Sequence, residues 1–134
     1  MTVHRIGLPP VLPNGAKVPL VPATRVGNLI FCSGALGVDA SFKLVDGGVG
    51  AQTRQAITNL KAVLAEAGAT LADVAKTTVW LTDLANFAEF NAAYSAEFGD
   101  TFPARSTVTS TLAIPGALVE IEAVAAIPET DKKS

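Results

Sequence analysis

The chain has 134 residues, of which 49% are hydrophobic and 16% are charged, with a formal net charge of -2. This length fits a single domain with its own core, and the acidic balance and lack of a Lys/Arg-rich run argue against nucleic acid as the main partner. One cysteine and one histidine exclude an internal disulfide and a zinc site built from Cys and His.

The composition also predicts a soluble, cytoplasmic protein that associates with copies of itself. No stretch approaches the roughly 18 apolar residues of a membrane span, and the chain does not begin with a basic segment followed by an apolar one. Charged residues are scarcer than their usual share of about 25%. We therefore expect part of the surface to be buried against other subunits.

The N-terminal segment is rich in proline, with five prolines within residues 8–22. Because proline has no amide hydrogen to donate, this segment is expected to run extended along an edge. We expect one domain over residues 1–134, with an extended arm at 1–17 and a loose charged tail at 128–134.

Two amphipathic helices are expected. Residues 50–67 carry apolar side chains at helical spacing, and Gly68 follows where a left-handed cap is expected. A second apolar stripe begins after Asp83 or Asn86, either of which could cap the helix, and it stops at Gly99.

Strand-forming residues occupy the remaining segments. The expected strands cover 28–33, 76–82, 104–111 and 117–127, with a capped helical turn at 70–73 and a Pro-Gly turn at 115–116. The order of strands, helix, strand, helix and strands predicts an α+β domain of two layers, with both helices covering one face of a mixed sheet. The other face of the sheet is expected to meet copies of the same chain.

Two features of the last strands could carry chemistry. Arg105 opens a strand of Ser, Thr and Val, and its guanidinium could hold a carboxylate through two parallel hydrogen bonds, although the pattern also fits an ordinary exposed arginine. Glu120 and Glu122 lie two apart in a strand, so their side chains leave the same face. A partly desolvated carboxylate there could deprotonate a water molecule, or the pair could mark a solvated face.

Five segments carry a family resemblance. They are NLIFCSG (28–34), KTTV (76–79), FNAAY (90–94), FPARST (102–107) and VEIEA (119–123). In this order and at this spacing they resemble the successive signatures of the Rid (YjgF-like) family of enamine/imine deaminases, over about residues 18–127.

The resemblance implies a chorismate-mutase-like fold and a homotrimer with three clefts between subunits. It also implies hydrolysis of 2-aminoacrylate-type enamines or their imine tautomers to 2-oxo acids and ammonia, as in a 2-iminobutanoate/2-iminopropanoate deaminase. No metal or other cofactor is expected, because an imine carbon is already electrophilic and water can attack it once the water and the acid are held in place.

The same resemblance assigns roles to residues by position. Arg105 would hold the substrate carboxylate, and Glu120 would position or activate the attacking water. Ser33 and Gly34 would line the pocket, and Asn91 matches a further family position near the cleft.

Two positions depart from the family pattern. Leu20 stands where the family often has Tyr, and Thr107, which we place among the substrate-binding residues, stands where it often has Cys. Loss of the phenol removes a possible hydrogen bond, and the more apolar cleft could favour a larger carboxylate.

Two other functions remain open from the sequence. The first is a trimer that binds small carboxylates without turning them over. The second is an endoribonuclease or translation inhibitor, for which the net charge of -2 and the presence of one Trp and one Tyr give little support.

Overall fold

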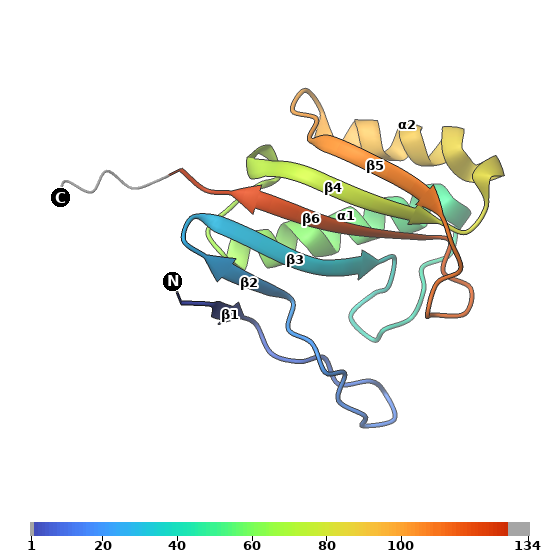
Figure 1. Ribbon diagram of the computed structural model, residues 1–134. Coiled ribbons are helices and arrows are strands. Elements are labelled where there is room, and N and C mark those ends of the chain that lie inside the picture. Colours follow the sequence, from blue (N-terminus) through green and yellow to red (C-terminus); the bar gives the residue numbers. More distant parts are fainter. Residues whose placement is uncertain (1, 129–134) are drawn as a thin grey trace.

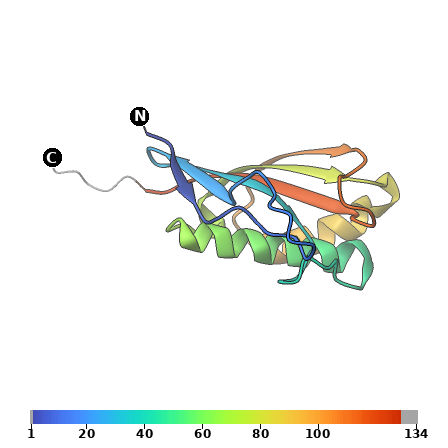
Figure 2. The ribbon, with the colours of Figure 1, turned by 90° about the horizontal axis from the view of Figure 1, so that it is seen from below.

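The computed structural model describes residues 2–128 and consists of a six-stranded sheet with two helices on one face (Figures 1 and 2). The strands are β1 (His4–Ile6), β2 (Ala23–Val26), β3 (Leu29–Leu36), β4 (Val74–Leu81), β5 (Ala104–Thr109) and β6 (Val119–Ala126). The helices are α1 (Gly48–Glu66) and α2 (Phe87–Phe98), with short 3-10 helices η1 (Leu71–Asp73) and η2 (Leu84–Asn86). The predicted two-layer α+β domain is confirmed. Residues 129–134 of the expected tail lie outside the described residues.

The strand order is β1-β2-β3-β6-β4-β5, so β6 lies in the middle of the sheet. It is antiparallel to both β3 and β4, whereas β4 and β5 are parallel. Strands that run in the same direction need a crossover connection, and α1 and α2 supply the two crossovers on the same face (Figure 2). The predicted turn at 115–116 therefore does not join neighbouring strands, because β4 lies between β5 and β6.

Helix ends follow the residues that the sequence marked. Gly68, just past α1, has the left-handed φ of +86° that a helix terminus favours. Thr70 and Asp73 form a capping box at η1. Asp83 caps η2, where its carboxylate accepts a hydrogen bond from the Ala85 amide at 2.9 Å, and Asn86 makes no side-chain cap to α2.

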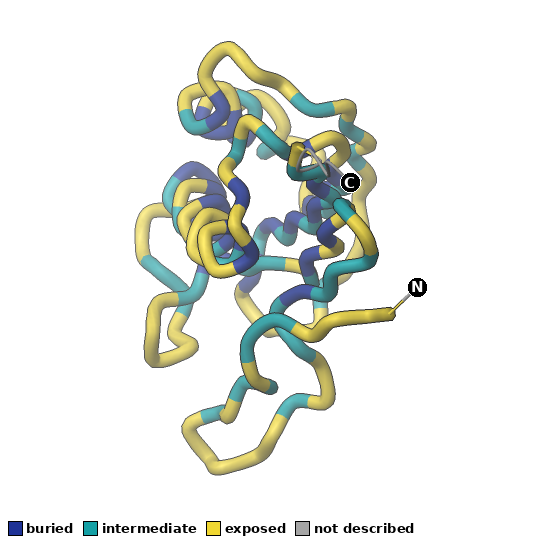
Figure 3. The backbone as a smooth tube through the Cα atoms, turned by 90° about the vertical axis from the view of Figure 1, so that its left-hand side faces the viewer, coloured by how far each residue is buried: buried dark blue, intermediate teal, exposed yellow. Residues whose placement is uncertain are grey.

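The core lies between the sheet and the helices. Along β6 the alternate residues Val119, Ile121 and Ala123 are fully or almost fully buried on the helix side, while Glu120 and Glu122 leave the opposite face. The buried stretches of strands and helices can be followed in Figure 3. The predicted common face of the two carboxylates is confirmed.

The face of the sheet away from the helices carries exposed apolar side chains. Leu29 and Phe31 on β3 and Val108 on β5 are 39%, 42% and 46% exposed. Association through this face stays a prediction. No helix within residues 2–128 combines the length and the apolar character needed to cross a bilayer.

The segment expected as an arm, residues 1–17, contains β1 (His4–Ile6), which lies at the edge of the sheet. After β1 the chain doubles back, with a bridge between Val11 and Lys17 (Figure 1). The turn is made by Asn14, whose side chain accepts a hydrogen bond from the Ala16 amide at 2.9 Å, and by Gly15 at φ +87°. An Asn-Gly pair is a strong turn signal, and here it decides the path of the chain between the prolines.

Candidate active site

Arg105 lies on the helix side of the edge strand β5. It pairs with Thr77 of β4, which is completely buried beneath α2, so both side chains face that helix. The guanidinium carbon lies 5.0 Å from the ring centroid of Tyr94, 5.2 Å from that of Phe90 and 5.8 Å from that of Phe87. These are cation-π distances, so three aromatic rings of α2 attract and orient the cation.

Tyr94 is itself held in place. Its hydroxyl group shares a 2.7 Å hydrogen bond with the Thr77 hydroxyl, and the residue is 4% exposed. Burial raises the pKa of the Tyr94 phenol, while the hydrogen bond to Thr77 and the charge of Arg105 oppose that rise. The ring is therefore neutral and fixed beneath the guanidinium. The sequence marked Tyr94 and its neighbours only as the buried stripe of a helix, because the pairing that brings Arg105 to them is set by sheet register.

Glu120 lies on the opposite face of the sheet from Arg105. It is paired with Trp80 of β4, three residues beyond Thr77, and side chains alternate along that strand. With Glu122, it borders a cavity of about 240 Å³, which is also lined by Gly34, Trp80 and residues 110–113. Burial raises the pKa of Glu120, and the nearby charge of Glu122 raises it further. A carboxyl group perturbed in this way is suited to accept a proton from water.

Ser33 and Gly34 form a β-bulge beside these carboxylates. Cys32 pairs with Ala123 and Ala35 with Ile121, so two residues of β3 stand opposite one residue of β6. A Cβ at Gly34 would collide with the carboxylate of Glu120, so the carboxylate can occupy this position only because residue 34 is glycine. The sequence predicted a strand that ends here and gave no signal for the bulge.

Ser33 also ties the bulge to the preceding loop. Its hydroxyl group donates a 2.7 Å hydrogen bond to the carbonyl oxygen of Val21, and its amide donates to the Pro22 carbonyl oxygen at 2.9 Å. Leu20, Ser33 and Gly34 line a second, mainly apolar cavity of about 600 Å³ between this loop, β3 and α1. Gly34 borders both cavities.

The remaining predicted site residues lie with Arg105. Thr107 faces the helix layer two residues further along β5, and its buried hydroxyl group has no hydrogen-bond partner among the described residues. Asn91 is half-buried on α2, one turn beyond Phe87.

The structure thus divides the predicted site residues into two groups. Ser33, Gly34 and Glu120 are brought together at the bulge, whereas Arg105 lies with Thr107 on the other face of the same sheet. Arg105 borders neither of the two cavities that Gly34 lines, and Glu120 borders the smaller of them. Within residues 2–128, no group of three or more His, Cys, Asp or Glu side chains is placed to hold a metal ion.

Comparisons with known proteins show the family to which the chain belongs. Residues 13–127 match a family model described as endoribonuclease L-PSP. A RutC family protein of Pyrococcus abyssi is 44% identical over 108 residues, which cover 80% of this chain and 85% of the relative. The 2-iminobutanoate/2-iminopropanoate deaminase of Escherichia coli is 41% identical over 110 residues, which cover 80% and 86%.

The fold is shared with solved structures of the same group. The crystal structure of the YjgF gene product of E. coli superposes with a TM-score of 0.81 at 36% identity, covering 93% of this chain and 99% of that one. The two-layer architecture is accordingly the chorismate-mutase-like fold that the sequence resemblance implied. On the family match, the relatives and the fold, the chain belongs to the YjgF/RutC family, the Rid family of enamine/imine deaminases that its sequence resembles.

Proposed function

We propose that the protein is a hydrolytic deaminase that converts 2-aminoacrylate-type enamines, through their imine tautomers, to 2-oxo acids and ammonia. The observation that carries the proposal is that the Arg105 guanidinium is fixed in place against three aromatic rings and has no ion-pair partner among the described residues. The cation is available to the carboxylate of a substrate. Relatives named as deaminases support the same reaction.

The reaction needs two tasks from the protein. Arg105 binds the substrate carboxylate through parallel N–H···O hydrogen bonds and so places the C=N bond. Glu120 takes a proton from a water molecule as the water oxygen bonds to the imine carbon, and Glu120 then donates this proton to the imine nitrogen. The hydroxyl group of the resulting carbinolamine then loses its proton, which is passed to the nitrogen as the C–N bond breaks. This releases ammonia and leaves the 2-oxo acid. One water is consumed for each ammonia formed.

The two tasks are performed by different copies of the chain in this proposal. Arg105 and Glu120 lie on opposite faces of one sheet, and the exposed Phe31 and Val108 offer apolar surface for association. We propose a homotrimer in which the Arg105 side of one subunit meets the Glu120 side of the next. The buried hydroxyl group of Thr107 and the amide of Asn91 would contact substrate beside Arg105, and Ser33 and Gly34 would line the Glu120 side.

The substrate side chain is expected to be apolar. Leu20 is 41% exposed and borders the 600 Å³ cavity together with Ser33 and Gly34. Gly34 also lines the smaller cavity beside Glu120. A substrate side chain that extends into the larger cavity would contact hydrocarbon and not a phenol. Larger carboxylates are therefore candidates along with the imines of three and four carbons.

The test is release of ammonia from 2-aminoacrylate generated in situ. We expect the protein to accelerate it, Arg105→Ala to abolish most of the acceleration, and Arg5→Ala, on the far edge strand β1, to keep it. Equal rates of ammonia release with and without the protein would reject the proposal.

A carboxylate-binding protein without turnover is the second candidate, because Arg105 would serve binding alone equally well. Calorimetry with 2-oxobutyrate, run beside the ammonia assay, distinguishes the two functions. Binding that needs Arg105 but is accompanied by no ammonia release would favour the carboxylate-binding protein without turnover.

Cleavage of RNA is a third candidate, favoured by the description of the matching family model. Incubation of a defined RNA with the same protein preparation tests it. Loss of full-length RNA that disappears in Arg105→Ala would support a nuclease, whereas cleavage that persists in this variant would indicate a contaminant.

A further inference from the structure

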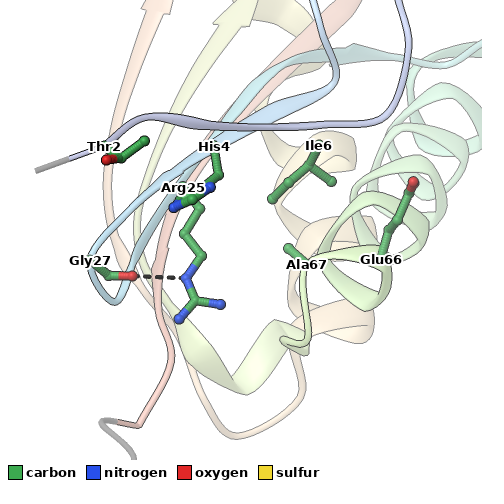
Figure 4. Close-up of a pocket in the computed structure, with 7 residues that line it drawn as sticks. All are labelled: Thr2, His4, Ile6, Arg25, Gly27, Glu66 and Ala67. Atoms are coloured by element: carbon green, nitrogen blue, oxygen red, sulfur yellow. Dashed lines mark hydrogen bonds between the residues drawn. The ribbon is translucent and has the colours of Figure 1, made fainter.

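A cavity of about 610 Å³ lies at the other edge of the sheet from Arg105 (Figure 4). It is formed between the β1–β2 hairpin and the C-terminal end of α1, and it is lined by Thr2, His4, Ile6, Arg25, Gly27, Glu66 and Ala67. None of these residues borders the two cavities near Glu120. The volume falls in the range of small-molecule sites, about 300 to 1,000 Å³.

Two basic side chains of this cavity are positioned by strand pairing. His4 of β1 and Arg25 of β2 stand directly opposite each other in the antiparallel register, so their side chains leave the same face. Arg25 is also paired with Ile30, which is completely buried on the helix side. Both basic residues therefore face α1 from a paired part of the sheet, not from a loop.

The guanidinium of Arg25 is oriented and still has donors to offer. Its Nε donates a 2.8 Å hydrogen bond to the Gly27 carbonyl oxygen, and Figure 4 shows the two Nη atoms beyond that bond. No carboxylate of the described residues forms an ion pair with it, and the side chain of Glu66 extends away from it at the far side of the cavity. The Nη1–Nη2 edge of the planar group matches the two oxygens of a carboxylate.

The rest of the lining selects the kind of acid. Ile6 and Ala67 provide an apolar wall between Arg25 and Glu66 in Figure 4. Glu66 places a negative charge in the same cavity, which disfavours a molecule with several negative charges. A single carboxylate with a short apolar body satisfies the guanidinium and the apolar wall together.

We infer that this cavity is a second ligand site, which binds a small apolar monocarboxylate. The carboxylate lies against the Nη atoms of Arg25, the imidazole of His4 offers a further polar contact, and the hydrocarbon part packs on Ile6 and Ala67. The inference does not depend on the proposed deaminase activity, because no residue is shared with that site.

The experiment is an amide NMR titration of the full chain with 4-methylpentanoate, carried out in the Arg105→Ala variant so that the candidate active site does not compete. We expect saturable shifts at Ile6, Gly27 and Ala67. Arg25→Gln should weaken binding about tenfold or more. Arg25→Lys keeps the charge but loses the planar Nη1–Nη2 edge, so it should give intermediate affinity.

Matched controls make the outcome decisive. Arg5→Gln changes the neighbouring residue of β1, which pairs with Thr24 and points to the other face, and it should leave the affinity unchanged. Inorganic phosphate and 4-methylpentan-1-ol should each bind more weakly than the acid. Equal affinity of the alcohol, equal weakening by Arg5→Gln, or shifts that do not reach Ile6 and Ala67 would overturn the inference.

Discussion

Arg105 combines a fixed position with an unneutralised charge. The rings of Phe87, Phe90 and Tyr94 restrict the guanidinium through attraction that uses none of its N–H groups. An ion pair with a carboxylate of the chain would orient the group equally well but would compete with substrate. An aromatic support leaves the hydrogen-bond donors free.

Replacement of the Tyr94 hydroxyl group tests how this support is held. Tyr94→Phe keeps the ring but leaves the completely buried Thr77 hydroxyl group without its 2.7 Å partner, which should lower the free energy of unfolding by about 1 to 3 kcal/mol. Chemical denaturation measures the change. The double variant with Thr77→Val removes both polar groups and should recover most of the loss, and a double variant no more stable than Tyr94→Phe would contradict this account.

Glu122 should control the acidity of Glu120. Burial is the larger cause of the raised pKa of Glu120 and the charge of Glu122 the smaller, so Glu122→Gln should lower that pKa part of the way toward its usual value. The acid limb of the kcat/KM profile should move to lower pH. An unchanged limb would show that Glu120 is not the group whose protonation stops the reaction.

The same change has a consequence for stability. A carboxyl group whose folded pKa exceeds its unfolded value of about 4.3 contributes stability that is fully present below that pH and lost as the pH rises through the folded pKa. Glu122→Gln should therefore stabilise the protein more near pH 7 than near pH 4. Glu97→Gln, which removes the carboxylate of the partly exposed ion pair with Lys61, is the control without an effect on Glu120.

At the scale of elements, the bulge in β3 shapes the Glu120 side of the site. It places two residues opposite Glu122, attaches Ser33 to the Val21 carbonyl oxygen and puts a glycine where a side chain would meet Glu120. A regular strand would have continued the pairing and removed the space between β3 and the carboxylates.

Gly34→Ala should displace the Glu120 carboxylate and lower kcat/KM by about a hundredfold or more, with the fold retained because the clashing atoms belong to a side chain. The ammonia assay measures kcat/KM.

A double-mutant cycle with Glu120→Ala, followed by the free energy of unfolding, tests the cause. In the Glu120→Ala background the added methyl group has room, so the effect of Gly34→Ala on the free energy of unfolding should largely vanish. Additive effects would show that Gly34 is required for its backbone and not for the space beside Glu120.

The sequence predicted single elements better than their placement. The spacing of apolar residues identified α1, the residues at 70–73 predicted the capped turn at η1, and the two-residue spacing of Glu120 and Glu122 gave their common face. Each of these depends on neighbours along the chain. The sequence did not identify β1, β2 or the bulge at Ser33. These features depend on contacts between distant segments, and the relative faces of Arg105 and Glu120 depend on a sheet register that no local pattern encodes.

At the scale of the whole molecule, the opposite faces of Arg105 and Glu120 make the proposed site a property of the assembly. Two inactive variants should therefore complement each other. In a trimer formed by mixing equal amounts of Arg105→Ala and Glu120→Ala chains, about one quarter of the clefts combine an intact Arg105 with an intact Glu120. Sedimentation establishes the trimer, and the ammonia assay on co-refolded chains measures the recovered activity.

A matched mixture distinguishes this result from simple stabilisation. Arg105→Ala chains co-refolded with chains that carry both substitutions contain no cleft with both residues, and they should stay inactive. Failure of the first mixture to recover activity, in a preparation shown to contain mixed trimers, would mean that both residues serve the same cleft from one copy.

The central place of β6 has a consequence for synthesis on the ribosome. Until residues 119–126 emerge, β3 and β4 each present an inner edge whose backbone groups have no strand to pair with. The nascent chain thus holds two incomplete halves that only its final strand can join, and a product that terminates before Val119 should be captured by chaperones or aggregate instead of folding.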